Sequence, residues 1–559
     1  MPRSDRHKPI LLELDLSQPL IEPDPGDPVG RIRTRGKPRL RAILRTLHDA
    51  GTDTRVVGLV AKLGGQPMPL SIAQELRDGV IAFASSGKPT VAWTDTFGES
   101  GSGTASYFLA TGFGEIWLQP SGELNLLGVA TEVTFLRGLL DKAGVEPEMG
   151  QRYEYKNAGD RIMQREFTPA HREASDRLAE SAWEQVVEGV AKARNLSPDD
   201  VQAATDRAPL FPEEALRDGL VDKLGYRDEV YADVRRRVGG DVRLLFADKW
   251  SARQQPVTRI TNLAKQKSAP GVALVEAFGG IAIGRSRRSP LQGAVLGSDT
   301  VCAAIRAAVR DEKCHAILFR VNSPGGSAVA SDSIWREVKL ACEAGKPVVV
   351  SMSTVAGSGG YYVACSADVI VATPATLTGS IGVVGGKAVT KELTDKFGLN
   401  YGDVSRGEHA LMYSRNRPFT DSERERLDAW LDHIYVDFTG KVAECRGMSR
   451  EAIHEVAKGR VWTGADAVKL GLIDELGGFR EALAIARKRG GLPDDAPLRP
   501  AVHVPTLAKL RPPTSTDDPR AASTGISLWA DGWGAFADLA QAAAWPALGP
   551  LTMTDVRLT

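Results

Sequence analysis

The stretch from Tyr107 to Val129, YFLATGFGEIWLQPSGELNLLGV, governs the interpretation of the whole sequence because a second version of it follows later. The second version, Tyr361 to Val383, reads YYVACSADVIVATPATLTGSIGV. Both keep the tyrosine, an alanine three residues on, a proline thirteen residues on and a closing Gly-Val, at one spacing (361 − 107 = 254). Similarity within a chain at a fixed spacing indicates an internal repeat. We therefore predict two copies of one domain.

The similarity extends in both directions from this stretch. Three further matches are Gly87-Lys88-Pro89 with Gly345-Lys346-Pro347, Asp141-Lys142 with Asp395-Lys396, and Gly219-Leu220-Val221-Asp222 with Gly471-Leu472-Ile473-Asp474. Their spacings (345 − 87 = 258, 395 − 141 = 254 and 471 − 219 = 252) drift by only a few residues. Such drift is expected of one backbone that carries small insertions and deletions in its loops.

Each copy is predicted to be an α/β domain with a parallel sheet and crossover helices. Apolar, β-rich runs alternate with helix-like segments, which is typical of parallel strands joined by helices. The expected strands are residues 10–16, 57–63, 90–93 and 115–118 in the first copy, and 272–276, 316–321, 348–351 and 369–372 in the second.

Changes in amino-acid composition along the chain give the expected domain boundaries. We expect the first copy at 8–237, a linker at 238–270 where Lys, Gln and Pro accumulate, the second copy at 271–490, and a Pro-rich tail at 491–559. The tail holds Trp529, Trp533, Phe536 and Leu539 near helical spacing. This pattern is compatible with a helix on a membrane surface or with packing against the domains.

The bulk numbers exclude several classes of protein. Seventy Lys and Arg balance seventy Asp and Glu, so no basic excess points to a nucleic-acid partner. Five scattered cysteines without a C-x-x-C pair argue against a zinc site or a disulfide framework. The sequence shows neither a signal peptide nor the roughly twenty apolar residues that a membrane span needs.

Two glycine-rich loops of the second copy point to acyl-transfer chemistry. Asn322-Ser323-Pro324-Gly325-Gly326 and Ala356-Gly357-Ser358-Gly359-Gly360 each follow an expected strand. A serine on a strand-to-helix turn is exposed as a nucleophile, and the N–H of the next residue can bind an oxyanion. We predict Ser358 as the nucleophile, with oxyanion donors from Gly359 and from Gly326 or Gly325.

A serine hydroxyl needs a base to take its proton. No histidine lies between Ser358 and His409, and the spacing of the later histidines suggests no acidic residue to orient them. A lysine can serve instead if its surroundings lower its pKa from about 10.4.

Together the motifs N-S-P-G-G-S, A-G-S-G-G-Y-Y and L-T-G-S-I-G-V resemble the bacterial signal peptide peptidase A family (protease IV), a branch of the Clp-protease/crotonase superfamily. The resemblance covers about residues 8 to 490 and fits the long two-copy form. It implies a serine endopeptidase with a Ser–Lys dyad, acting on cleaved signal peptides and small unfolded apolar peptides without metal or cofactor. It also implies a tetramer that is associated with a membrane. The alternative location is the cytoplasm.

The resemblance identifies the base as Lys156. The short form carries its lysine after the serine in the same domain, but the corresponding stretch here, 405–412, contains none. The first copy instead reads Tyr153-Glu154-Tyr155-Lys156-Asn157-Ala158, similar to the base motif of the long form, while its counterpart of Ser358 is Thr104. The resemblance also implies that Ser380 orients the lysine amine. Whether Lys156 meets the Ser358 of its own chain or of a neighbour is left open.

Three alternatives remain. A crotonase-like acyl-CoA enzyme uses the same oxyanion loops without a serine nucleophile. An α/β-hydrolase esterase would explain the turn around Ser358. The internal repeat argues against it, and so does the absence of an acid followed by a histidine. A catalytically inactive scaffold on the same fold is the third.

Overall fold

A computed structural model describes residues 8–22, 36–64, 67–99, 101–252, 269–289, 293–502, 515, 518–522 and 551–552. The first of its two large sheets has six parallel strands in the order β6-β4-β3-β2-β1-β7. These strands are β1 (Ile10–Asp15), β2 (Val56–Lys62), β3 (Thr90–Thr94), β4 (Glu115–Leu118), β6 (Lys223–Leu224) and β7 (Arg243–Phe246).

The second large sheet repeats the first strand for strand, in the order β19-β15-β14-β12-β8-β20. Its parallel strands are β8 (Gly271–Phe278), β12 (Cys314–Ser323), β14 (Val348–Gly357), β15 (Val369–Ala372), β19 (Glu475–Leu476) and β20 (Leu498–Pro500). The longer β14 also pairs with β16 (Leu377–Gly379), which runs antiparallel to β18 (Val461–Thr463). The predicted fold, two α/β domains in tandem, is confirmed.

Helices follow the strands at matching positions in the two copies. The first copy contains α2 (Leu40–Thr52), α3 (Leu70–Ala84), α4 (Thr104–Ala110), α5 (Arg137–Ala143), α6 (Asp160–Met163), α7 (Pro169–Arg194), α8 (Pro198–Arg207), α9 (Pro212–Arg217) and α10 (Arg227–Arg237). The second contains α12 (Ser298–Arg310), α13 (Ala328–Glu343), α14 (Gly359–Tyr362), α15 (Lys391–Lys396), α16 (Asp421–Arg446), α17 (Arg450–Val456), α18 (Gly464–Lys469) and α19 (Phe479–Arg489). The longest helices, α7 and α16, both span 26 residues and begin at a threonine cap.

Equivalent hydrogen bonds recur where the repeated sequence is most similar. The carboxylate of Asp222 accepts the N–H of Ile116 at 2.7 Å, and that of Asp474 accepts the N–H of Ile370 at 2.7 Å. Likewise, the Tyr107 hydroxyl donates to the carbonyl of Leu220, as the Tyr361 hydroxyl does to the carbonyl of Leu472. The repeated residues therefore stabilise the same junction of sheet and helix twice.

Two of the expected boundaries need correction. Strand β7 lies inside the segment expected as a linker, 238–270, and β20 lies inside the expected tail, 491–559. Each pairs with the first strand of its own copy, β1 or β8, so the edge of each sheet is completed by residues from the end of that copy. Both strands are too short to show an alternating pattern. The four apolar tail residues, Trp529 to Leu539, lie outside the described residues.

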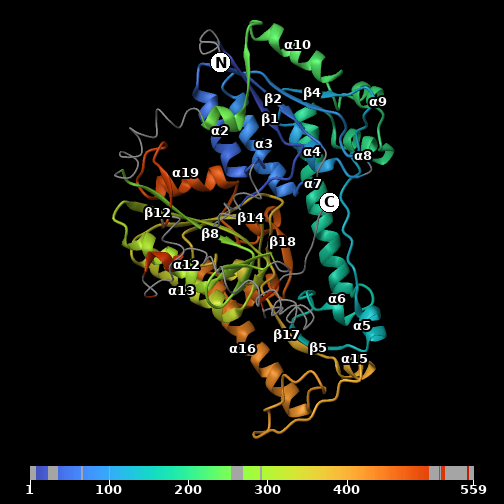
Figure 1. Cartoon of the computed structure of the whole chain (residues 1–559), viewed down its shortest axis with the longest axis vertical. Helices are drawn as coiled ribbons and strands as arrows, with labels where there is room; N and C mark the ends of the chain where they lie inside the picture. Colours follow the sequence, from blue (N-terminus) through green and yellow to red (C-terminus); the bar gives the residue numbers. More distant parts are fainter. Residues whose placement is uncertain are drawn as a thin grey trace.

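The two copies pack against each other where α3 of the first copy meets β14 of the second, and through a separate arm (Figure 1). Helix α7 of the first copy runs down beside the second copy, where Ser181 contacts Thr463 of β18 at 2.8 Å. At the lower end, β5 (Glu146–Arg152) of the first copy pairs antiparallel with β17 (Val383–Val389) of the second. We call this two-stranded sheet the arm ribbon.

None of the helices in the described parts of the chain combines the length and apolar composition of a membrane span.

A buried ionic cluster also joins the copies. Arg320 of β12 is fully buried and donates to Glu75 of α3 at 2.6 Å and, through Nε, to Glu22 at 2.6 Å. Glu75 also accepts the N–H of Phe479, and burial raises the pKa of its carboxyl, an effect that Arg320 partly offsets. Buried carboxylates of this kind depend on their cation.

We predict that Arg320→Met lowers the free energy of unfolding by about 3–5 kcal/mol, because two acidic groups then lose their buried partner. Urea unfolding followed by tryptophan fluorescence measures the change. The matched control is Arg336→Met, since Arg336 is exposed on α13, and it should change stability by less than about 0.5 kcal/mol. Equal urea midpoints for the two variants contradict the assigned role of Arg320.

Candidate active site

Ser358 lies at a sharp turn between β14 and α14. It is buried and has a positive φ of 54°, a backbone conformation that non-glycine residues rarely adopt. Its N–H donates to the carbonyl of Gly379 at 2.8 Å, which fixes the turn against β16. Strain of this kind is typical of functional sites, where the surrounding structure holds a residue in place.

The two glycine-rich loops contact each other beside Ser358. A Cβ added to Gly359 would lie 3.1 Å from the Cα of Gly325 and 3.2 Å from the nitrogen of Gly326. Gly326 has a φ of 152°, and a Cβ there would lie 2.1 Å from the carbonyl oxygen of Ile281. Only glycine therefore permits this close approach of the backbones.

Lys156 reaches the same place from the first copy. It lies four residues beyond the end of β5, and its Nζ is 2.8 Å from the Oγ of Ser358 in the same chain. The arm ribbon holds Lys156 near the second copy. In it, β5 and β17 pair at seven positions, from Glu146 opposite Val389 to Arg152 opposite Val383.

Burial changes the acidity of the lysine. The side chain of Lys156 is only 1% exposed, and loss of hydration lowers the pKa of its amine well below the usual value. A neutral amine has a lone pair that can accept a proton.

Ser380 completes the surroundings of the amine. Its Oγ and its carbonyl oxygen both lie 3.0 Å from the Nζ of Lys156. Ser380 also has a positive φ, 51°, and its N–H donates to the carbonyl of Arg460. The sequence-predicted residues Ser358, Lys156, Ser380, Gly325, Gly326 and Gly359 thus gather around one point.

A contact that sequence reasoning missed holds the lysine loop. The N–H groups of Tyr153 and Tyr155 donate to the carbonyl of Lys458, in the loop after α17. A Cβ on the next residue, Gly459, would lie 2.5 Å from the Cα of Lys156, so this glycine permits the close packing. A single glycine after a helix is a common cap in sequence and gave no sign of this contact.

The corresponding positions elsewhere in the repeat form no such site. Thr104, the counterpart of Ser358, is buried and donates its hydroxyl to the carbonyl of Gly128 at 3.0 Å. Ala410, at the position of the second copy that corresponds to Lys156, is exposed in the loop before α16.

An extended segment pairs with the first glycine loop. Strand β21 (Leu551–Thr552) runs antiparallel to β13 (Gly325–Gly326), with Leu551 opposite Gly326. On its other side β13 pairs with β9 (Gly280–Ala282). The edge of β13 that faces away from β9 therefore accepts an extended backbone.

Comparison with known proteins agrees with this geometry. The model of peptidase family S49 matches residues 82–240 and 341–492. The chain is 33% identical over 478 residues to "Serine protease SPPA, chloroplastic" from Arabidopsis thaliana, covering 84% of this chain and 67% of that protein. It is 32% identical over 462 residues to "Protease 4" from Salmonella typhi, covering 79% and 71%. It is 28% identical over 458 residues to "Protease 4" from Haemophilus influenzae, covering 79% and 71%. The chain therefore belongs to peptidase family S49 and is a serine peptidase.

Proposed function

We propose that this peptidase is a Ser–Lys endopeptidase that degrades cleaved signal peptides and other small, unfolded apolar peptides. The observation that carries the proposal is the 2.8 Å contact between the Lys156 amine and the Ser358 hydroxyl in a buried setting. A surface lysine would stay protonated near neutral pH, whereas a buried one is available as a base.

The contacts of the amine suit this role. A neutral amine has two N–H groups, which donate to the carbonyl and the Oγ of Ser380, and one lone pair, which accepts the Ser358 proton. The Ser358 oxygen then attacks the peptide carbonyl, and the protonated Lys156 donates its proton to the leaving amine. Water hydrolyses the acyl-enzyme, with Lys156 as base again.

The oxyanion is assigned to backbone donors on the glycine loops. The N–H of Gly359 and an N–H of Gly325 or Gly326 stabilise the negative oxygen of the tetrahedral intermediate. The contact between these loops supports the assignment. The pairing of β13 with β21 supports a substrate that binds as an extended antiparallel strand at the same edge.

The remaining parts of the proposal concern assembly and location. We propose a homo-oligomer, a tetramer in the form that the resemblance implies, associated peripherally with a membrane. Mass measurement in solution and co-sedimentation with lipid vesicles test the two statements separately.

The alternative acyl-CoA enzyme has no use for an activated serine. A serine-directed fluorophosphonate probe should label the wild-type protein on Ser358, identified by peptide mass spectrometry. A protein that binds acyl-CoA and resists the probe supports the alternative and contradicts the proposal.

We predict that Ser358→Ala and Lys156→Ala each lower kcat/KM for an apolar peptide at least about a thousandfold. The double variant should lose little more than either single one, because the two residues act as a unit. Full peptidase activity in Ser358→Ala, or additive losses in the double variant, contradicts the assigned roles.

The pH dependence should report the ionisation of Lys156. Protonated amine cannot accept the Ser358 proton, so kcat/KM should rise about tenfold per pH unit and level off above the amine's pKa. Because burial lowers that pKa, the midpoint should lie well below 10.4, the ordinary value for lysine. A midpoint near 10.4 contradicts a buried neutral base. The Lys156→Arg variant, which stays charged, should be inactive throughout.

We predict that Gly359→Ala lowers kcat/KM at least about a hundredfold, because the added methyl group would lie 2.6 Å from the Oγ of Ser331 and 3.1–3.2 Å from the backbone of Gly325 and Gly326, and so would displace the oxyanion loops. Gly138→Ala is the matched control, since a Cβ there meets nothing within 4 Å. Peptide hydrolysis by both variants measures the effect. Equal activities of the Gly359→Ala and Gly138→Ala variants contradict the assignment of Gly359 to the oxyanion site.

A further inference from the structure

The loop between α17 and β18 contacts both sides of the active-site amine. The carbonyl of Lys458 accepts the N–H of Tyr155, the residue before Lys156, at 3.2 Å. Two positions further on, the carbonyl of Arg460 accepts the N–H of Ser380 at 2.6 Å. One short loop of the second copy therefore binds the backbone on each side of the amine.

The side chain of Arg460 extends this contact into the first copy. Its guanidinium lies 4.9 Å from the ring centre of Tyr155 and 4.2 Å from that of Trp462 in β18. It also donates to the carboxylate of Glu173 on α7 at 2.7 Å. Burial and a hydrogen bond to the same carboxylate raise the pKa of the Tyr155 hydroxyl. We call these four residues the arginine clamp.

The arginine clamp has little freedom to move. Only 14% of the Arg460 side chain is exposed. A guanidinium is planar, stacks on aromatic rings and keeps its charge throughout the pH range of proteins. One carboxylate and two rings therefore hold this guanidinium, and it holds Tyr155 in turn.

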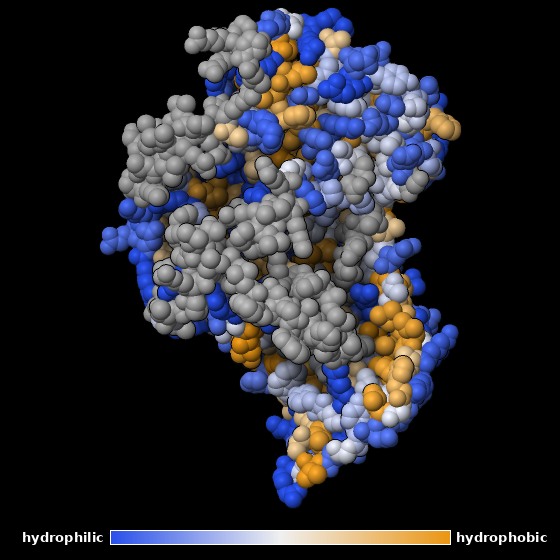
Figure 2. Space-filling view, in the orientation of Figure 1, coloured by the Kyte–Doolittle hydropathy of each residue, from blue (hydrophilic) through white to orange (hydrophobic). Residues whose placement is uncertain are grey.

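The arm that carries Lys156 buries few side chains of its own. Within the described arm, α5 has no buried side chain and β5 buries only Pro147. Leu139 of α5 is 64% exposed, and Figure 2 shows hydrophobic surface on the arm. Lys156 is nevertheless only 1% exposed. Its burial therefore depends on contacts with the second copy.

The repeat provides a comparison that lacks the clamp. Helices α9 and α18 begin at corresponding positions, with a spacing of 252 residues (464 − 212 = 252). At this spacing Arg460 corresponds to Ala208, and Trp462 corresponds to Leu210. The first copy therefore forms the same fold without the arginine and the tryptophan, which occur only in the copy that meets the lysine.

Hydration sets the charge of the Lys156 amine. Its hydrogen-bond partners are the hydroxyl of Ser358 and the hydroxyl and carbonyl of Ser380, none of which is charged. The acidic residues nearby, Glu154 and Glu173, act on the preceding tyrosine. Loss of water lowers the pKa of the amine, so returning water would raise it.

We propose that Arg460 is a positioning residue, which keeps the lysine loop (residues 153–156) closed over the Lys156 amine. The inference rests on the proposed role of Lys156 as the base. The guanidinium acts through Tyr155 and Glu173 rather than on the reacting atoms. Without it, the loop would loosen and water would reach the amine. A larger share of the amine would then be protonated at neutral pH and unable to act as a base.

The pH dependence of peptide hydrolysis tests the proposal. Arg460→Met removes the cation and keeps much of the side-chain volume. It should raise the midpoint of kcat/KM against pH by at least about one unit. At pH values below the wild-type midpoint, this shift lowers kcat/KM about tenfold. Arg460→Lys keeps a cation for the rings and the carboxylate, so its midpoint should lie between those of the wild type and Arg460→Met.

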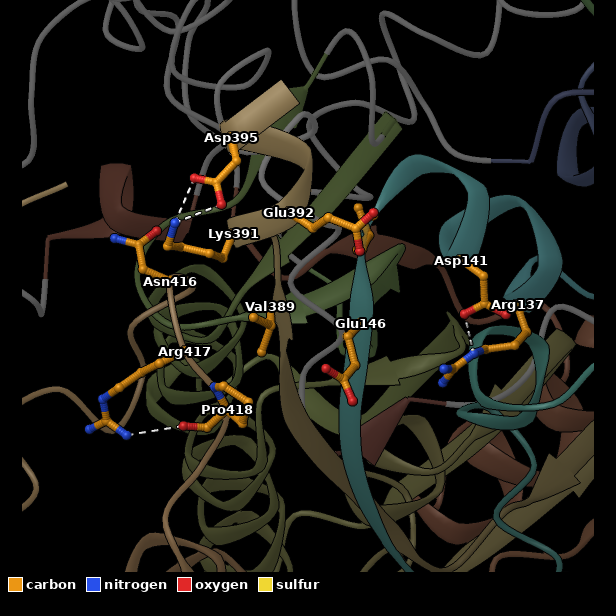
Figure 3. Close-up of a pocket in the computed structure, with 12 residues that line it drawn as sticks. Arg137, Asp141, Glu146, Val389, Lys391, Glu392, Asp395, Asn416, Arg417 and Pro418 are labelled. Carbon is orange, nitrogen blue, oxygen red and sulfur yellow. Dashed lines mark hydrogen bonds and ion pairs between the residues drawn. The ribbon is translucent and has the colours of Figure 1, made fainter. Parts of the chain in front are cut away.

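The matched control is Arg137→Met, which breaks another arginine ion pair on the same arm. Arg137 contacts Asp141 at 2.7 Å beside the pocket between α5 and α15 (Figure 3), and the Arg137 side chain is 28% exposed. This variant should leave the midpoint unchanged. An equal shift in Arg137→Met, or an unchanged midpoint in Arg460→Met, overturns the proposal.

Hydrogen exchange tests the clamp without relying on the chemistry. The N–H groups of residues 153–156 should exchange faster in Arg460→Met than in the wild type, and at the wild-type rate in Arg137→Met. If Arg460→Met fails to fold, Glu173→Ala takes its place, because the Glu173 side chain is 51% exposed. It should raise both the exchange rate and the midpoint. A wild-type midpoint at the ordinary lysine value contradicts the proposed base, whereas exchange that neither variant changes contradicts the clamp.

Discussion

The antiparallel pairing of β5 with β17 is the constraint on which the site depends, because it is the connection that carries Lys156 from one copy to Ser358 of the other. A strand advances about 3.4 Å per residue, so a slip of one position would exceed the length of the Lys156–Ser358 contact. It would also turn every side chain of β5 to the opposite face. The close packing of Gly459 against Lys156 adds a second restraint on the same loop.

Much of the fold and the cluster of site residues could be predicted from the sequence. The repeat predicted two similar sheets, and the expected strands around residues 57–63 and 316–321 appear as β2 and β12. The glycines around Ser358 indicated a sharp turn because few other residues fit one. Lys156 was found through the family resemblance and through the absence of a lysine in 405–412. The catalytic roles of these residues remain predictions.

Other features depend on contacts between distant parts of the chain and left no local pattern. The bond between Arg320 and Glu75 joins residues 245 positions apart, and each alone reads as an ordinary surface charge. Strands β7 and β20 are short and owe their place to the edges of β1 and β8. The loop at Lys458 and Gly459 resembles any helix end until the first copy is packed against it.

The placement of the amine and the hydroxyl on separate copies has a consequence for biosynthesis. Lys156 and Ser358 are 202 residues apart in the chain, and at about 5–20 residues per second the ribosome needs roughly 10–40 s to make the intervening part. The second sheet then still awaits β20 at its edge. A nascent chain that holds only the first copy therefore lacks the nucleophile, and the proposed dyad forms only after the second copy has been made.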